Sequence, residues 1–71
     1  MLEALLEGLN HDQAAVRLDV ARVLGMLDET RALDALRRRY RLEPDTDVRA
    51  VIGWAGGRVH EAQQAGYDTV K

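Results

Sequence analysis

The sequence lacks cysteine and phenylalanine, and it holds one proline and one tryptophan among 71 residues. Without cysteine, neither a disulfide nor a thiolate metal site can stabilise a chain this short. A domain of roughly 60 residues buries only about 60% of the surface that its unfolded chain exposes. The additional burial is therefore expected from stacked repeats or from association with another chain.

A strong net charge and long apolar runs are also missing. The formal net charge is −2, which gives no general attraction to nucleic acid or to an anionic membrane. The apolar runs are too short to span a bilayer. The N-terminal segment carries Glu3 and Glu7, where a secretion signal needs basic residues. These features predict a cytoplasmic protein that does not bind membranes and is not expected to bind nucleic acid.

What the sequence does contain is an internal repeat. Residues 16–27 read VRLDVARVLGML and residues 48–59 read VRAVIGWAGGRV, at an offset of 32. The identical pairs are Val16 with Val48, Arg17 with Arg49 and Gly25 with Gly57. Apolar positions upstream of each segment match at an offset of 31, so the difference of one residue falls in the loop. The chain is therefore predicted to hold two repeats, at about residues 1–28 and 30–60.

Each repeat is predicted to consist of two helices, because apolar residues recur at helical spacing. Asp12 is expected to cap the second helix, and Thr30 the third. Pro44 should end the third helix, since the residue before a proline avoids helical geometry. The fourth helix is expected to run on to about residue 65. Gly66 is a plausible stop for it and residues 67–71 a tail, so the repeats with their last helix occupy residues 1–66.

The second helix has the longest apolar stripe of the chain. Its members are Val16, Val20, Val23, Leu24 and Leu27. Val20 and Leu24 lie at the centre of this stripe. They are therefore predicted to be among the most buried residues.

The second helix and the turn before it carry a recognisable pattern. Its members are Asp12, Val16, Arg17, Ala21, Leu24 and Gly25. This pattern resembles the HEAT-like repeats of phycobilisome lyases and many bacterial scaffold proteins. The second repeat keeps the valine and arginine but has Gly53 and Gly56 where the first has alanine and leucine. The resemblance covers roughly residues 2–60 and implies an all-α fold, a short α-α superhelix of two helical hairpins.

The resemblance also implies a role for Arg17 and Arg49, because repeats of this kind use that arginine to tie neighbouring turns together. The expected partners are the turn acids Asp12, Asp45 and Asp47. Binding of an anion or a protein partner is the alternative for both arginines. The structural role is favoured because arginine suits fixed polar geometry.

Two features are candidate contact sites. Arg37, Arg38 and Arg41 form a basic cluster with the neighbouring Arg39, which either binds a phosphate or acidic partner or forms a solvated outer face. No aromatic residue interleaves with the cluster, as stacking on nucleic acid would favour.

Trp54 is the second candidate contact site, since it falls on the polar face of the fourth helix, together with Arg58. It is expected to be partly exposed. It then either contacts a partner, as interface tryptophans often do, or packs on the tail at Tyr67.

No catalytic set, cofactor or metal is predicted. HEAT-like deoxyhypusine hydroxylases use several His-Glu pairs, whereas this chain has one, His60 with Glu61. Gly53, Gly56 and Gly57 lie inside a predicted helix rather than after a strand, so they are not a nucleotide-binding loop. These glycines are expected to permit close helix approach or a kink.

The leading functional interpretation is a non-enzymatic protein-interaction or scaffold module. The alternative is a subunit or fragment of a HEAT-like enzyme such as a bilin lyase, and nucleic-acid binding, as in HEAT-like DNA glycosylases, is third. Residues 1–30 hold six acids and two bases, whereas residues 31–60 hold four acids and seven bases. This asymmetry, with apolar ends on both repeats, predicts self-association. A closed two-fold homodimer with Trp54 near the contact is favoured over an open contact that would give filaments.

Overall fold

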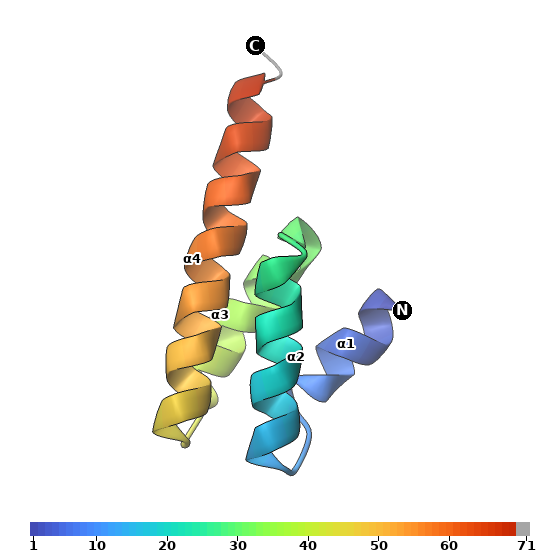
Figure 1. Cartoon of the computed structure of the whole chain (residues 1–71), viewed down its shortest axis with the longest axis vertical. Helices are drawn as coiled ribbons and strands as arrows, with labels where there is room; N and C mark the ends of the chain where they lie inside the picture. The colour runs from blue at the N-terminus through green and yellow to red at the C-terminus, as the bar shows by residue number, and fades with distance from the viewer. Residues whose placement is uncertain (70–71) are drawn as a thin grey trace.

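The computed structural model describes the backbone of residues 1–69 and the side chains of residues 1–66. Its elements are α1 (Leu2–Gly8), α2 (Ala14–Met26), the 3-10 turn η1 (Thr30–Ala32), α3 (Leu33–Leu42) and α4 (Thr46–Thr69). The described residues contain no strand, and two helical hairpins pack against each other, with α2 beside α4 and α3 packed on α4 (Figure 1). The predicted all-α architecture is confirmed. None of the described helices combines the length and the apolar character that crossing a membrane requires.

The turn between α3 and α4 follows the prediction. Helix α3 ends at Leu42, and Glu43, which precedes Pro44, is extended. The side chain of Asp45 accepts the backbone N–H groups of Asp47 at 2.9 Å and Val48 at 3.0 Å. Asp45 therefore caps α4, and its carboxylate satisfies two donors that the helix itself cannot.

The two predicted helix caps, Asp12 and Thr30, are wrong. Ahead of α2 the N–H of Gln13 is bound by Nδ1 of His11 at 3.0 Å, and not by Asp12. Ahead of α3 the N–H of Arg31 is bound by the side chain of Glu29 at 3.1 Å, while Thr30 begins the short turn η1. In both turns the side chain that accepts the hydrogen bond lies two residues before the donor.

The C-terminal helix is longer than predicted. Helix α4 continues through Gly66 to Thr69, so three residues of the predicted tail belong to the helix, and residues 70–71 lie outside the described part. One glycine in an exposed helix costs only about 1 kcal/mol relative to alanine, which does not by itself end the helix.

The core lies where α2, η1, α3 and α4 meet. Its buried apolar residues are Leu9, Ala21, Leu24, Ala32, Leu33, Leu36, Val48, Ile52, Ala55 and Val59. Leu24 is fully buried, as predicted, but Val20 is only partly buried and lies against Gly8 of α1. The prediction for Val20 is wrong because the second hairpin covers only one side of α2, the side that carries Ala21 and Leu24.

Gly25 lies where α2 closely approaches α4. A Cβ built at this position would lie 2.6 Å from Cζ3 of Trp54 and 3.0 Å from Cα of Ala55. Only glycine leaves room for the α4 backbone there. By contrast, nothing lies within 4 Å of a Cβ built at Gly56 or Gly57, although all three glycines lie within helices.

Candidate functional site

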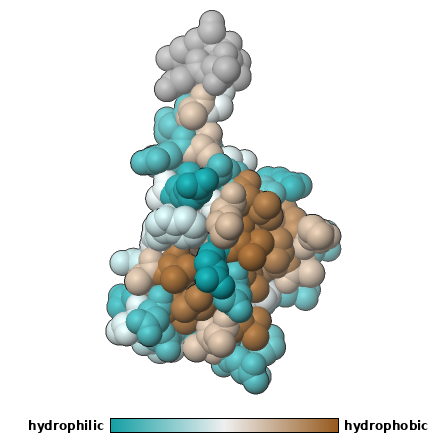
Figure 2. All heavy atoms as spheres, in the orientation of Figure 1, coloured by the Kyte–Doolittle hydropathy of each residue, from teal (hydrophilic) through white to brown (hydrophobic). Residues whose placement is uncertain are grey.

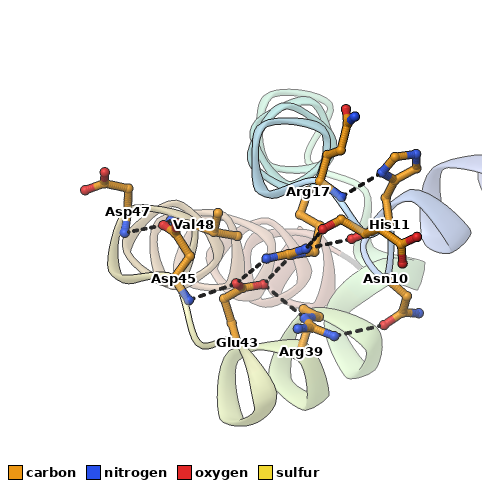
Figure 3. A network of polar contacts seen from close by, with 10 residues as sticks. Asn10, His11, Arg17, Arg39, Glu43, Asp45, Asp47 and Val48 are labelled. Carbon is orange, nitrogen blue, oxygen red and sulfur yellow. Dashed lines mark hydrogen bonds and ion pairs between the residues drawn. The ribbon is translucent and has the colours of Figure 1, made fainter.

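A buried ion pair connects the two interhelical turns (Figure 3). Arg17 donates from Nε to Oε1 of Glu43 at 2.8 Å and from Nη2 to Oε2 at 2.9 Å. Its Nη1 donates to the carbonyl oxygens of His11 at 2.7 Å and Asp12 at 2.9 Å. Arg17 therefore ties the turns together, as the resemblance implied, but its carboxylate partner is Glu43 rather than Asp12, Asp45 or Asp47.

Glu43 is the centre of this turn network, which comprises Asn10, His11, Asp12, Arg17, Arg39, Glu43 and Asp45. Besides the hydrogen bonds from Arg17, Glu43 accepts one from Nε of Arg39 at 3.1 Å and one from the N–H of Asp45 at 3.0 Å. Arg39 in turn donates to Oδ1 of Asn10 at 3.4 Å. Glu43 is only 4% exposed. One carboxylate thus joins α2, α3 and the start of α4, and its hydrogen bonds compensate for its burial.

The sequence interpretation missed Glu43. The signal that could have identified it is a carboxylate directly before the only proline and two residues before a helix cap. In that position the side chain can fold back onto the turn and meet a basic residue of the preceding repeat.

Burial alone would raise the pKa of Glu43. The hydrogen bonds from Arg17, from the N–H of Asp45 and from Arg39 outweigh this effect, so the pKa of Glu43 lies below its ordinary value of 4.5. The hydrogen bond to Glu43 likewise raises the pKa of Arg17. Both groups are therefore charged at neutral pH.

We expect the stability of the chain to fall as the pH drops below about 4.5, the ordinary pKa of Glu43. A carboxyl whose pKa is lower in the folded chain stabilises the fold fully above its unfolded pKa. This stabilisation is lost as the pH falls through the folded pKa. Urea unfolding midpoints from pH 7 to pH 2, roughly the range over which carboxyl groups titrate, should decline less steeply for Glu43→Gln than for the unmodified chain.

Glu29→Gln is the matched control for this pH profile. The hydrogen bond from Arg31 lowers the pKa of Glu29, but Arg31 is 71% exposed and Glu29 20% exposed, so water reaches both groups of this pair. The control should therefore retain nearly all of the acid-dependent decline. Identical slopes for the unmodified chain and Glu43→Gln would contradict the assigned role of the network.

Arg49, the repeat counterpart of Arg17, has a different environment. It is exposed, and its guanidinium lies over the ring of Tyr40 at 5.4 Å from the centroid. Among the described residues it forms no ion pair with the turn acids that the sequence suggested. The difference arises because the carboxylate that holds Arg17 comes from the following hairpin.

The basic cluster does not form one surface. Arg39 belongs to the turn network, whereas Arg37 and Arg41 line a hollow of about 540 Å³ beside Tyr40. Arg38 lies on a different side of α3, near Leu6 and Leu42. Arg37 and Arg41 therefore share one face of α3. A partner role for Arg37, Arg38 and Arg41 stays a prediction.

An apolar groove lies between α2 and α4. Arg22, Met26, Ala50, Val51 and Trp54 line it, with a volume of about 470 Å³. Trp54 is 48% exposed and Met26 is 64% exposed. Figure 2 shows hydrophobic surface in this region between the two helices. The side chain of Tyr67, the other predicted neighbour of Trp54, lies outside the described residues.

Arg58 contacts Trp54, one of the residues that line this α2–α4 groove. Its guanidinium lies over the ring of Trp54 at 5.9 Å from the centroid. It also donates to the carbonyl of Gly25 at 2.8 Å and pairs with Asp28 at 3.0 Å. These contacts place the arginine at the C-terminus of α2, where a cation is favoured. A direct contact of Arg58 with a partner stays a prediction.

His60 and Glu61 do not converge. His60 lines the hollow beside Tyr40, whereas Glu61 lies near Asp28 and Arg58. Within the part of the chain that the structure describes, no three histidine or carboxylate groups are close enough together to hold a metal ion.

A family model described as HEAT repeats matches residues 1–55, which is more than half of the chain. No curated protein and no solved structure matches the sequence.

Proposed function

The chain belongs to the HEAT-repeat family, and from this premise we propose that it is a non-enzymatic protein-interaction module whose α2–α4 groove binds an apolar segment of a partner. HEAT repeats generally mediate contacts between proteins. The observation that carries the proposal is the half-exposed Trp54 beside Met26 in the groove. Tryptophan is enriched among the residues that dominate binding energy, and methionine adapts to irregular apolar surfaces.

The shape of the groove defines the kind of partner. Its lining is almost entirely apolar, and Arg22 is its only charged member. Arg22 already pairs with Asp19 at 2.7 Å, on an exposed part of α2. The groove is therefore not suited to recognising a charged group of a partner. An extended or helical segment with one or two large apolar side chains would cover Trp54 and Met26 and remove their surface from water.

We expect peptides selected from a displayed random library to be rich in large apolar residues and to bind in the groove. Binding should shift the emission of Trp54, the only tryptophan, to shorter wavelength in a saturable titration. Met26→Lys should weaken binding at least tenfold, because a charge would then be buried against an apolar segment.

Leu42→Lys is the matched control for Met26→Lys, since Leu42 is 63% exposed on α3, away from the groove. It should bind the selected peptides as the unmodified chain does. Peptides that bind Met26→Lys and the unmodified chain equally would refute the groove as the binding site.

Two narrower hypotheses share this fold. Membership of the bilin-lyase branch, or a role as part of such an enzyme, would be supported by bilin absorbance in the purified protein. A closed homodimer with Trp54 at its contact would be supported by a mass of two chains that falls to one in Met26→Lys.

A further inference from the structure

The chain displays, at its two ends, the two halves of the contact that joins its own hairpins. The inner face of the first hairpin consists of Arg17, Ala21, Leu24 and Gly25, and all four are buried under the second hairpin. A shift of 32 residues moves this face onto Arg49, Gly53, Gly56 and Gly57. These four positions, with Tyr40, Arg37 and Arg41, form what we call the C face.

The C face is open where its counterpart is covered. Leu9 is 1% exposed, whereas Tyr40, its counterpart at an offset of 31, is 44% exposed. Gly25 lies against Ala55 of α4, whereas nothing lies within 4 Å of a Cβ at Gly57. The hollow beside Tyr40 is lined by this face. A helix could therefore approach Gly57 as closely as α4 approaches Gly25.

The opposite end of the chain presents the complementary half, which we call the N face. The second hairpin covers the first with Val48, Ile52, Ala55 and Val59, each at most 1% exposed. Their counterparts 32 residues earlier are Val16, Val20, Val23 and Leu27. Val23 is 39% exposed and Leu27 is 60% exposed, whereas Val16 and Val20 are partly buried. Figure 2 shows a continuous hydrophobic area over α1 and α2.

We propose that the N face of a second copy of this chain stacks on the C face, in the arrangement by which the second hairpin stacks on the first. One kind of contact would then cover both ends of the chain. The charges favour the same pairing, because residues 1–30 carry a net charge of −4 and residues 31–60 carry +3. Such a contact is heterologous and leaves a free face at each end, so it continues into longer assemblies.

The turn network predicts that this stacking is weaker than the internal contact. Glu43 binds the N–H two residues further on, and His11 does the same in the first hairpin. His11 therefore occupies, in the first hairpin, the position that Glu43 occupies in the second. Arg49 of one copy would meet His11 and the adjacent Asp12 of the next copy instead of a glutamate. The assembly should form reversibly and depend on concentration.

The pairing of unlike faces also distinguishes this contact from the closed homodimer. A two-fold contact sets one patch against itself, so a chain whose patch is blocked has no second, intact face with which to bind another copy. In head-to-tail stacking each variant blocks one end and leaves the other end free.

The test is sedimentation equilibrium of the full chain from micromolar to millimolar concentration. The mean mass of the unmodified chain should more than double over this range. Gly57→Gln, which fills the C face, and Val23→Glu, which charges the N face, should each remain monomeric. An equimolar mixture of the two should give a complex of two chains that does not grow further.

Gly66→Gln is the control, because Gly66 lies in α4 with nothing within 4 Å of its Cβ position and outside the C face. It should associate as the unmodified chain does, and circular dichroism should show the same helicity in every variant. A monomeric mass at millimolar concentration would overturn the proposal, as would a mixture of the two blocked variants that stays monomeric. Because Trp54 lies in the α2–α4 groove, peptide binding can be measured separately on the monomeric variants.

Discussion

Replacing Leu24 with alanine is expected to lower the free energy of unfolding by about 2–5 kcal/mol. Leu24 is fully buried, on the face of α2 that packs against the second hairpin. The substitution removes apolar contacts and leaves a cavity that the surrounding helices fill only in part. A domain of this size has only a few kcal/mol of stability. Most of the Leu24→Ala protein should therefore be unfolded at about 25 °C.

The measurement is urea unfolding followed by circular dichroism, with Leu42→Ala as the control. Leu42 is 63% exposed, so its truncation should change the free energy of unfolding by no more than about 0.5 kcal/mol. Equal midpoints for Leu24→Ala and the control would mean that α2 does not present this face to α4.

The helical architecture was predictable because its signals are local. The apolar spacing of residues 2–9 and 16–27, the break at Pro44 and the cap at Asp45 each act within a few residues. The two wrong caps show the limit of such signals. His11 and Asp12 are neighbours that can both bind a helix N-terminus. Arg17 donates to the carbonyl oxygens of both residues, and only the side chain of His11 accepts the N–H of Gln13.

The error at Val20 has a different cause. The apolar stripe of α2 contains Val20, Val23 and Leu27, which the second hairpin does not bury. Packing at the interface instead falls on Ala21 and Gly25, whose small size lets the helices approach. A pattern of hydrophobicity ranks valine above glycine and cannot show which side of a helix a neighbour covers. The repeat offset contained part of that information, since Gly25 recurs as Gly57.

The site was predicted in part. Trp54 was expected to be partly exposed, and it is, but its groove partner Met26 comes from α2, 28 positions earlier. Arg17 was assigned to the turns, yet its partner Glu43 lies 26 residues further on. Such contacts depend on how the hairpins stack, which local spacing does not specify. Arg49 shows the same point, because the same residue type at the same repeat position is exposed when no following hairpin covers it.

Replacing Glu43 with glutamine is expected to lower the free energy of unfolding at neutral pH by about 3 kcal/mol. The substitution keeps the size of the side chain and removes its charge. Arg17 and Arg39 then face a neutral group in a buried position, and Arg17 is only 8% exposed. A buried cation without its counterion is costly, because water cannot replace the lost interaction.

The comparison that tests this result is Glu29→Gln, which removes one carboxylate from an ion pair whose glutamate is 20% exposed and whose arginine is 71% exposed. Arg31 remains solvated in that variant, so the unfolding midpoint should barely move. Urea unfolding of the two variants at neutral pH isolates the effect of burial, since both lose the same charge and the same atom type. If the two midpoints fall equally, the loss reflects net charge and not the turn network. If only the midpoint of Glu43→Gln falls, a single buried carboxylate joins the two hairpins. Arg49, at the C face, lacks such a carboxylate partner.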